Sequence, residues 1–197
     1  MQQPCIVVGG GKVAERKVRM LLQFNASITL ISPDVTPLLH RLAEKRRITL
    51  VKRAYRKGDL KKALLVFAAT NNTAINHNVK RDASELRIPV NVADNPELCD
   101  FIVPSIIKKG PIVIAISTSA TLPLLSKKLR KEIEALIRDT HIAYAKNIGR
   151  FRKLLIQTIR DENTRKRIMK RIEKMDMRDV ASKKIPELYK LILHHTP

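Results

Sequence analysis

Residues 6–21 read IVVGGGKVAERKVRML, in which three consecutive glycines separate a short apolar run from a basic, helix-forming segment. The chain has only six glycines in 197 residues, so half of them occur at this one junction. Glycine adopts backbone conformations that other residues avoid, and it leaves space beside the chain. The stretch therefore predicts a strand, a tight turn and a helix at the start of the chain.

Short runs rich in Ile, Val and Leu alternate with longer polar segments over the first 92 residues. The short runs are typical of strands buried on both faces, and the longer segments are typical of helices. Such alternation predicts crossover units and a mainly parallel sheet. The expected strands are residues 5–8, 27–31, 48–51, 64–69 and 89–92, and the expected helices are residues 13–24, 36–46 and 73–87.

The pattern changes in the second half of the chain, where one further strand is followed only by amphipathic helices. The strand is expected over residues 112–117, and the helices over residues 122–138, 142–159, 162–174 and 187–193. The expected fold class is therefore α/β, with a Rossmann-like parallel sheet followed by a small segment and an all-helical C-terminal domain. The corresponding boundaries are residues 1–112, 113–145 and 146–197.

The chain is strongly basic, with 39 Lys and Arg residues against 18 Asp and Glu residues and a formal net charge of +21. Such a charge attracts anions, which leaves nucleic acid, an anionic membrane surface or a polyanionic small molecule as candidate partners. Aromatic residues make up only 4% of the chain and are not interleaved with the basic clusters. This composition does not favour a reader of single-stranded nucleic acid.

No run approaches the roughly 18 uninterrupted apolar residues of a membrane helix, and the N-terminus lacks a signal-peptide pattern. We therefore expect a cytoplasmic protein without a membrane partner. Cys5 and Cys99 are too few and too far apart for a disulfide framework or a sequence-local metal site. No residue is assigned as a metal ligand.

The glycine junction matches the dinucleotide-binding fingerprint, with Ala14 at its third small position. In that fingerprint Gly9 permits the tight turn, and Gly11 lets the backbone approach a diphosphate. The free amides at the start of the next helix attract phosphate oxygens. A turn without a ligand could also use these glycines. The residues expected to bind the cofactor here are Gly9, Gly10, Gly11, Lys12 and Val13.

Polar residues also follow the second and fourth expected strands. Pro33 and Asp34 follow the second strand, where a carboxylate would bind a ribose hydroxyl and favour NAD over NADP. Asp34 could equally cap the next helix. Thr70 and Asn71 follow the fourth strand, along the edge where a nicotinamide would lie, although Asn71 or Asn72 could instead cap the helix after it.

Five segments occur in a characteristic order: VVGGGKVAERKVRMLL, ITLISPD, GDLKKALLVFAATNN, VNVADNPELCDFIVPSI and IVIAISTSATLPLLSKKLRKEIE. Together they resemble the precorrin-2 dehydrogenase family of sirohaem synthesis, over about residues 5–138. The resemblance implies an NAD-binding Rossmann domain, a central dimerisation segment and a helical domain, assembled as a homodimer. It also implies oxidation of precorrin-2, an anionic tetrapyrrole, to sirohydrochlorin with NAD+. Some members also insert ferrous iron as a ferrochelatase, and the sequence leaves that activity open.

The resemblance assigns a catalytic role to Asp94, which matches the aspartate that the family is thought to use. A carboxylate there would accept the substrate proton or help to strip pyrrole protons before metal insertion. Without the resemblance, the stretch of Asp94, Asn95 and Pro96 is an ordinary turn sequence.

Ser117 and Thr118 end the strand of residues 112–117 and precede a helix, so they could hold a substrate carboxylate or cap that helix. The chain departs from its relatives nearby, because Ser119 and Ala120 replace a pair of glycines. Asn71 and Asn72 replace paired aspartates in the same way.

Two other classes of function fit some of these features. A Rossmann module could bind NAD as a signal without catalysis, and it would not need Asp94. A basic nucleic-acid-binding protein would use the positive charge directly. The carboxylates of precorrin-2 give the charge a role without nucleic acid.

Overall fold

The computed structural model describes residues 3–93, 95–119, 121–184, 186–188 and 190. The chain forms two compact units, Met1–Val103 and Pro104–Pro197.

The first unit is built on a five-stranded sheet in the order β3-β2-β1-β4-β5, and every neighbouring pair is parallel. This arrangement confirms the α/β fold class with a Rossmann-like parallel sheet. The five strands that the apolar runs predict are all present. Their bounds are β1 (Pro4–Val8), β2 (Ser27–Ile31), β3 (Thr49–Val51), β4 (Leu65–Ala68) and β5 (Val90–Val92).

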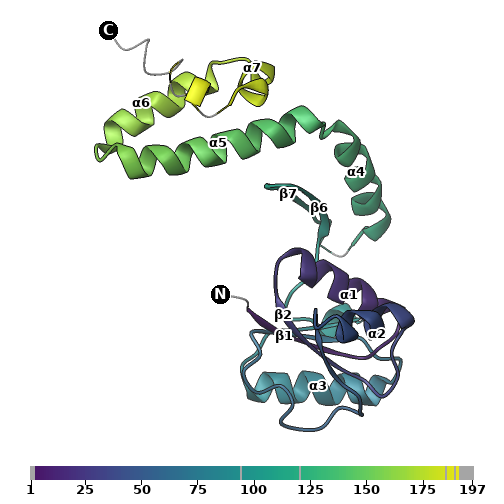
Figure 1. Cartoon of the computed structure of the whole chain (residues 1–197). Helices are drawn as coiled ribbons and strands as arrows, with labels where there is room; N and C mark the ends of the chain where they lie inside the picture. Colours follow the sequence, from purple (N-terminus) through teal and green to yellow (C-terminus); the bar gives the residue numbers. More distant parts are fainter. Residues whose placement is uncertain (1–2, 94, 120, 185, 189, 191–197) are drawn as a thin grey trace. The chain divides into compact units, whose positions relative to one another are not determined.

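Helices cover both faces of this sheet (Figure 1). Helices α1 (Lys12–Gln23) and α2 (Pro37–Glu44) lie on one face, and α3 (Thr73–Glu85) lies on the other. A short 3-10 helix, η1 (Pro96–Leu98), follows β5. Because successive side chains of a strand point to opposite faces, the sheet contributes to two separate cores.

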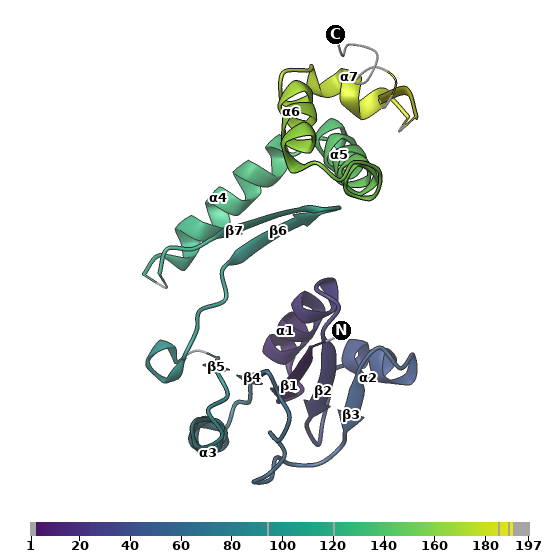
Figure 2. The same cartoon turned by 90° about the vertical axis from the view of Figure 1, so that its left-hand side faces the viewer.

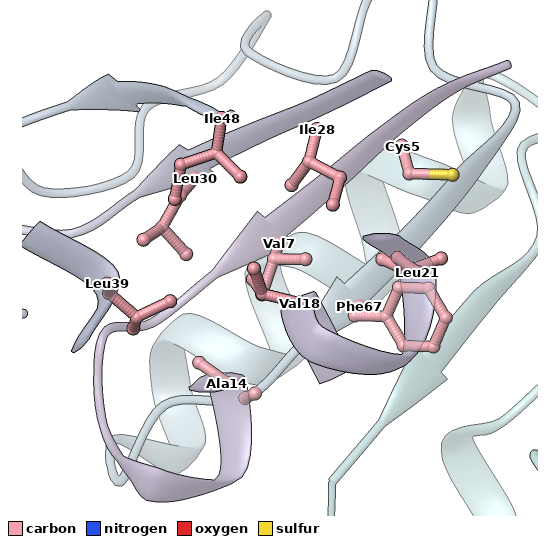
Figure 3. Close-up of a cluster of buried hydrophobic side chains, with 11 residues drawn as sticks. Cys5, Val7, Ala14, Val18, Leu21, Ile28, Leu30, Leu39, Ile48 and Phe67 are labelled. Carbon is pink, nitrogen blue, oxygen red and sulfur yellow. The ribbon is translucent and has the colours of Figure 1, made fainter. Parts of the chain in front are cut away.

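The core beneath α1 and α2 contains Val7 from the central strand, with Leu30 and Phe67 from its two neighbours (Figure 3). Val18 packs against them from α1. The core on the α3 side contains the alternate residues of the same strands. Strands buried in this way on both faces are expected to read as continuous apolar runs, which explains why the sequence predicts them well.

The second unit begins with an antiparallel hairpin of β6 (Ser105–Lys109) and β7 (Ile112–Ile116). The sequence predicts β7 but not β6. Gly110 lies in the turn with a φ of +59°, a conformation that favours glycine. The expected domain boundary at residue 112 therefore falls inside this hairpin, and the division of the second half into two parts stays a prediction.

Four helices follow the hairpin: α4 (Pro123–Leu136), α5 (Asp139–Thr158), α6 (Glu162–Glu173) and α7 (Met177–Ser182). The sequence predicts the first three and misses α7. Helix α4 packs beside the hairpin (Figure 2). Lys109 joins the two, because its Nζ donates to the carbonyl oxygens of Glu134 and Ile137 at the end of α4, at 2.9 and 3.0 Å.

The helices α5, α6 and α7 share a small core of their own. Phe151 and Leu155 of α5 are fully buried against Ile172 of α6 and Val180 of α7, and Leu188 joins the same cluster. A single polar side chain also ties α5 to the end of α7. The Nδ2 atom of Asn147 donates to carbonyl oxygens of residues 180, 181 and 183, at 3.0, 3.2 and 3.1 Å.

Candidate cofactor site

A cleft of about 670 Å³ lies at the carboxyl ends of the parallel strands in the first unit. All five strands run in one direction, so the loops after β1, β2 and β4 meet at the same edge of the sheet. In open parallel sheets this edge is where ligands bind. The residues that line the cleft are Gly9, Gly10, Gly11, Lys12, Val13, Ser32, Pro33, Asp34, Val35, Thr36, Ala69, Thr70, Asn71, Asn72, Ile75 and Ala93.

The structure brings together every residue that the sequence nominates for cofactor binding. Their role in binding stays a prediction. These nine residues are Gly9, Gly10, Gly11, Lys12, Val13, Pro33, Asp34, Thr70 and Asn71.

The first two glycines are required by the packing of the loops. Gly9 has a φ of +114°, and a Cβ there would overlap the carbonyl group of Ala69. A Cβ at Gly10 would overlap the carbonyl oxygen of Asp34 and lie 2.8 Å from Oγ of Ser32. Larger residues at either position would push the three loops apart.

Gly11 differs, because the fold does not require a glycine at this position. Its backbone is extended, with a φ of −80° and a ψ of −171°, a conformation open to any residue. A Cβ built at Gly11 would have no heavy atom within 4 Å. The missing side chain therefore leaves open space beside the start of α1, which is the space that a diphosphate occupies in dinucleotide-binding proteins.

The N-terminus of α1 also differs from those of the neighbouring helices. Among the described residues, no side chain caps α1 at Gly11. In contrast, the amide of Leu39 in α2 donates to Thr36, and the amide of Ile75 in α3 donates to Asn72. The first amides of α1, together with the helix dipole, are thus available to an anion in the cleft.

The loop after β2 is held by hydrogen bonds that the sequence analysis does not anticipate. The hydroxyl of Ser32 donates to the carbonyl oxygen of Asp34 at 2.7 Å, and the amide of Thr36 donates to Gly10 at 3.0 Å. The hydroxyl of Thr36 donates to Oε2 of Glu15 at 2.6 Å. Thr36 is the cap of α2, so Asp34 does not cap that helix, and its exposed side chain lies at the cleft.

Asn76 of α3 is the main residue of this site that sequence reasoning misses. It is 7% exposed and holds the loop after β4 through Thr70. The alternative that Asn72 caps α3 is confirmed, since its Oδ1 accepts from the Ile75 amide at 3.1 Å. A signal for Asn76 exists in the helical pattern, because this amide precedes the buried Val79 by three residues and therefore shares its face.

Ser117 and Thr118 belong to the second unit and bond to their own loop. The amide of Ser119 donates to Oγ of Ser117 at 3.1 Å, and the amide of Leu122 donates to Oγ1 of Thr118 at 3.3 Å. Ser119 has a φ of +51°, in the left-handed region that glycine adopts most easily. The Ser119 substitution therefore keeps a glycine-like backbone.

The predicted catalytic residue Asp94 lies outside the described residues. Among the residues that the structure describes, no group of three or more His, Cys, Asp or Glu side chains could hold a metal ion. None of the helices in the described part of the chain is long and apolar enough to cross a membrane.

Comparison with curated proteins finds relatives from sirohaem synthesis. The "Siroheme synthase" of Methylobacillus flagellatus is 42% identical over 155 residues, which cover 79% of this chain and 33% of the relative. The "Siroheme synthase" of Nitrosomonas europaea is 41% identical over 166 residues, which cover 83% of this chain and 35% of the relative. The chain thus spans about a third of the length of the curated relatives it matches.

Comparison with solved structures finds the same fold in a protein described as "SirC, precorrin-2 dehydrogenase". The TM-score is 0.78 at 23% sequence identity, and the match covers 98% of this chain and 96% of the other. At this identity the match shows a shared fold, and the names of the curated relatives agree with the resemblance that the five sequence segments indicate.

The family model described as "Putative NAD(P)-binding" matches residues 1–105, the part of the chain that contains the glycine loop and the whole cleft. On this match, and on the cleft that it contains, the chain belongs to the "Putative NAD(P)-binding" family.

Proposed function

We propose that this chain is an NAD+-dependent precorrin-2 dehydrogenase that forms sirohydrochlorin. The observation that carries the proposal is Gly11, a glycine that the fold does not need, at the uncapped start of α1. The relatives named "Siroheme synthase" and the structural match named "precorrin-2 dehydrogenase" support the choice of substrate.

Each loop of the cleft has a distinct part in holding NAD+. The bare backbone at Gly11 and the first amides of α1 receive the diphosphate. The exposed carboxylate of Asp34 accepts hydrogen bonds from ribose hydroxyls and repels a 2′-phosphate. Thr70 and Asn71, in the loop after β4, flank the nicotinamide end. When bound, NAD+ supplies the acceptor for the hydride that leaves the substrate.

The oxidation releases a hydride and a proton from precorrin-2, so the site also needs a proton acceptor. We assign this role to Asp94, which follows β5 by two residues in the sequence. A carboxylate takes up the proton and passes it to solvent, which regenerates the base for the next turnover. The carboxylates of the substrate are attracted by the net charge of +21.

We further propose that the chain acts in the cytoplasm as a homodimer formed through the second unit. Three leucines of the α4 region support this assembly, since Leu122, Leu124 and Leu136 are 57%, 82% and 67% exposed. Leu122 and Leu124 lie at the start of α4 and Leu136 at its end, and the proposal takes them to belong to one partner-binding surface, since exposed apolar patches are typical of such surfaces. The neighbouring β7 adds Val113, which is 49% exposed.

The proposed function is tested by anaerobic incubation of the full chain with precorrin-2 and NAD+, following NADH and the sirohydrochlorin spectrum. We expect both products in equal amounts. The variant Asp94→Asn should lose more than about 99% of the rate, because general acid-base groups contribute factors of this size. The matched control Glu97→Gln changes an exposed carboxylate nearby and should keep the rate.

The other outcomes separate the remaining functions. Binding of NAD+ without any oxidation would favour the regulatory module and contradict our proposal. Addition of ferrous iron after the oxidation tests whether the chain also forms sirohaem, with iron as a second substrate. Retention of the chain on DNA or RNA that persists at physiological salt would favour the nucleic-acid-binding alternative.

A further inference from the structure

A groove of about 720 Å³ lies between α5 and α6 in the second unit, and it shares no residue with the cofactor cleft. Helix α6 runs back along the C-terminal part of α5 after a short turn (Figure 1). On α5 the lining is confined to one turn, at Arg152, Leu155 and Ile156, whereas on α6 it extends from Glu162 to Glu173. The groove, called the wedge below, therefore runs the length of α6 against about one turn of α5, and its volume is in the range of small-molecule sites.

The floor of this wedge is apolar. Its apolar lining consists of Leu155, which is 1% exposed, Ile156, which is 57% exposed, and Met169 of α6. A side chain such as Ile156 that stays largely in water in the free protein gains stability when an apolar ligand covers it. The floor therefore fits a ligand with an apolar body.

The rim of the wedge is cationic. Five Lys and Arg residues line it against two carboxylates, those of Glu162 and Glu173. Glu162 is already paired with Lys166 at 2.8 Å. Among the described residues, no carboxylate forms an ion pair with Arg152 or Lys170, which come from the two different helices. The rim therefore fits a ligand with several negative charges around its apolar body.

Two of the remaining rim cations are oriented by neutral groups. Nη1 of Arg165 donates to the carbonyl oxygens of Ile159 and Arg160, at 2.6 and 2.8 Å. Nη2 of Arg167 donates to Oγ1 of Thr164 at 3.1 Å. These contacts orient the two guanidinium groups. In the described part of the chain, no carboxylate takes part in the contacts of Arg165. Arg167, in contrast, lies close enough to Asp161 to add to the Thr164 hydrogen bonds that lower the pKa of that carboxyl. The lining contains no aromatic side chain on which a nucleic-acid base could stack.

We propose that this wedge is a second binding site, for a tetrapyrrole polycarboxylate held outside the cofactor cleft. The general preference for an apolar polyanion follows from the wedge itself, and the choice of a tetrapyrrole rests on the proposed function. The flat ring lies on Leu155, Ile156 and Met169, and its carboxylates reach Arg152 and Lys170.

The test uses metal-free coproporphyrin III, a porphyrin with four carboxylates, and follows its fluorescence anisotropy on the full chain. The groove variant is Arg152→Glu with Lys170→Glu. The matched control is Arg150→Glu with Lys153→Glu, which changes the net charge equally at exposed positions of α5 outside the groove. We expect the groove variant to bind at least about tenfold more weakly and the control to change by less than about twofold.

Two further measurements test the two halves of the site. Ile156→Gln removes the exposed part of the apolar floor and should weaken binding by about threefold. The tetramethyl ester of the same porphyrin keeps the ring but carries no charge, and it should bind far more weakly. Thermal melts of every variant establish that the helical unit stays folded.

Each contrary result identifies which proposal fails. Equal weakening in the groove variant and the control would show that net charge alone attracts the porphyrin, and would overturn the second site. Binding that neither pair of substitutions weakens would also overturn it, while leaving the dehydrogenase proposal intact. Groove-dependent binding in a chain that forms no NADH from precorrin-2 would overturn the proposed function and keep the site.

Discussion

Asn76 and Thr70 are joined by hydrogen bonds in both directions. The amide and the hydroxyl of Thr70 lie 3.3 and 2.7 Å from Oδ1 of Asn76, and Nδ2 of Asn76 donates to the carbonyl oxygen of Thr70 at 3.1 Å. One buried side chain therefore bonds both backbone groups of Thr70, in the loop that follows β4. The loop takes its shape from α3 before any ligand binds, which lowers the entropic cost of binding.

Replacement of Asn76 tests this role. Asn76→Ala leaves the polar groups of Thr70 without their partner, so we expect a loss of about 1–3 kcal/mol in the free energy of unfolding. The affinity for NAD+ should fall by about tenfold in the fraction that stays folded. Urea denaturation and calorimetric titration measure the two effects. Asn78→Ala, at an exposed position of the same helix, is the control and should change neither.

Gly11 offers a substitution that separates binding from folding. Gly11→Val places a side chain in space that is empty in the free protein, and its backbone conformation suits valine. We expect an unchanged melting temperature and an affinity for NAD+ lowered by more than about tenfold, because the side chain occupies the position of the diphosphate. Full NAD+ affinity in Gly11→Val would contradict the proposed binding mode. Gly9→Val, in contrast, should fail to fold stably.

Asp34 is expected to set the preference between the two nicotinamide cofactors. Asp34→Ser removes the carboxylate that repels a 2′-phosphate, so the affinity for NADP+ should rise while that for NAD+ falls by about tenfold. Calorimetric titration with each oxidised cofactor gives the ratio of the two affinities. Glu44→Ser, an exposed acid on α2 outside the cleft, should leave the ratio unchanged.

Tyr55 predicts how stability depends on alkaline pH. Burial, followed by its 2.8 Å hydrogen bond to the buried Asp82, raises the pKa of the Tyr55 hydroxyl well above its usual value. The unfolded chain therefore loses this proton first, and the unfolding free energy falls as the pH rises above about 10. Tyr55→Phe should flatten that dependence, as measured by urea denaturation over a series of pH values. An equally steep dependence in Tyr55→Phe would contradict the assignment.

The proposed dimer is tested at Leu124, which is 82% exposed on α4. Leu124→Asp should turn a dimer into a monomer by raising its dissociation constant more than about a hundredfold, since a charge in a desolvated interface is costly. Analytical ultracentrifugation measures the assembly. Leu86→Asp, at an exposed leucine of the first unit, is the control. A monomeric unmodified chain at high concentration would refute the dimer directly.

The parallel sheet is predictable because its strands are buried on both faces and read as unbroken apolar runs. Strand β6 has no such signature, since only Ile107 is buried and two lysines end the strand. The nearby Gly110 is the one local sign of a hairpin. The amphipathic helix predicted over residues 122–138 is present as α4. Two leucines of its apolar face, Leu125 and Leu136, are nevertheless 42% and 67% exposed. Periodicity predicts that a face is apolar, and it does not identify what covers it.

The candidate site was predictable where the backbone itself makes the cleft. The glycines of this loop have the spacing that leaves room for a diphosphate, and Gly9, Gly10 and Gly11 all line the cleft. Asn76 is different, because a polar residue on a helix usually reads as a surface position. Its role depends on contacts with a loop that precedes it, which the helical pattern alone does not contain.

The core of α5, α6 and α7 also constrains the order in which the chain folds during synthesis. Phe151 and Leu155 share their core with Val180 and Leu188, and Asn147 finds its acceptors at residues 180, 181 and 183. While a ribosome is making the last of these residues, the helical core stays incomplete and its apolar surface is open to chaperones. The sheet of the first unit depends on none of them and is free to fold earlier.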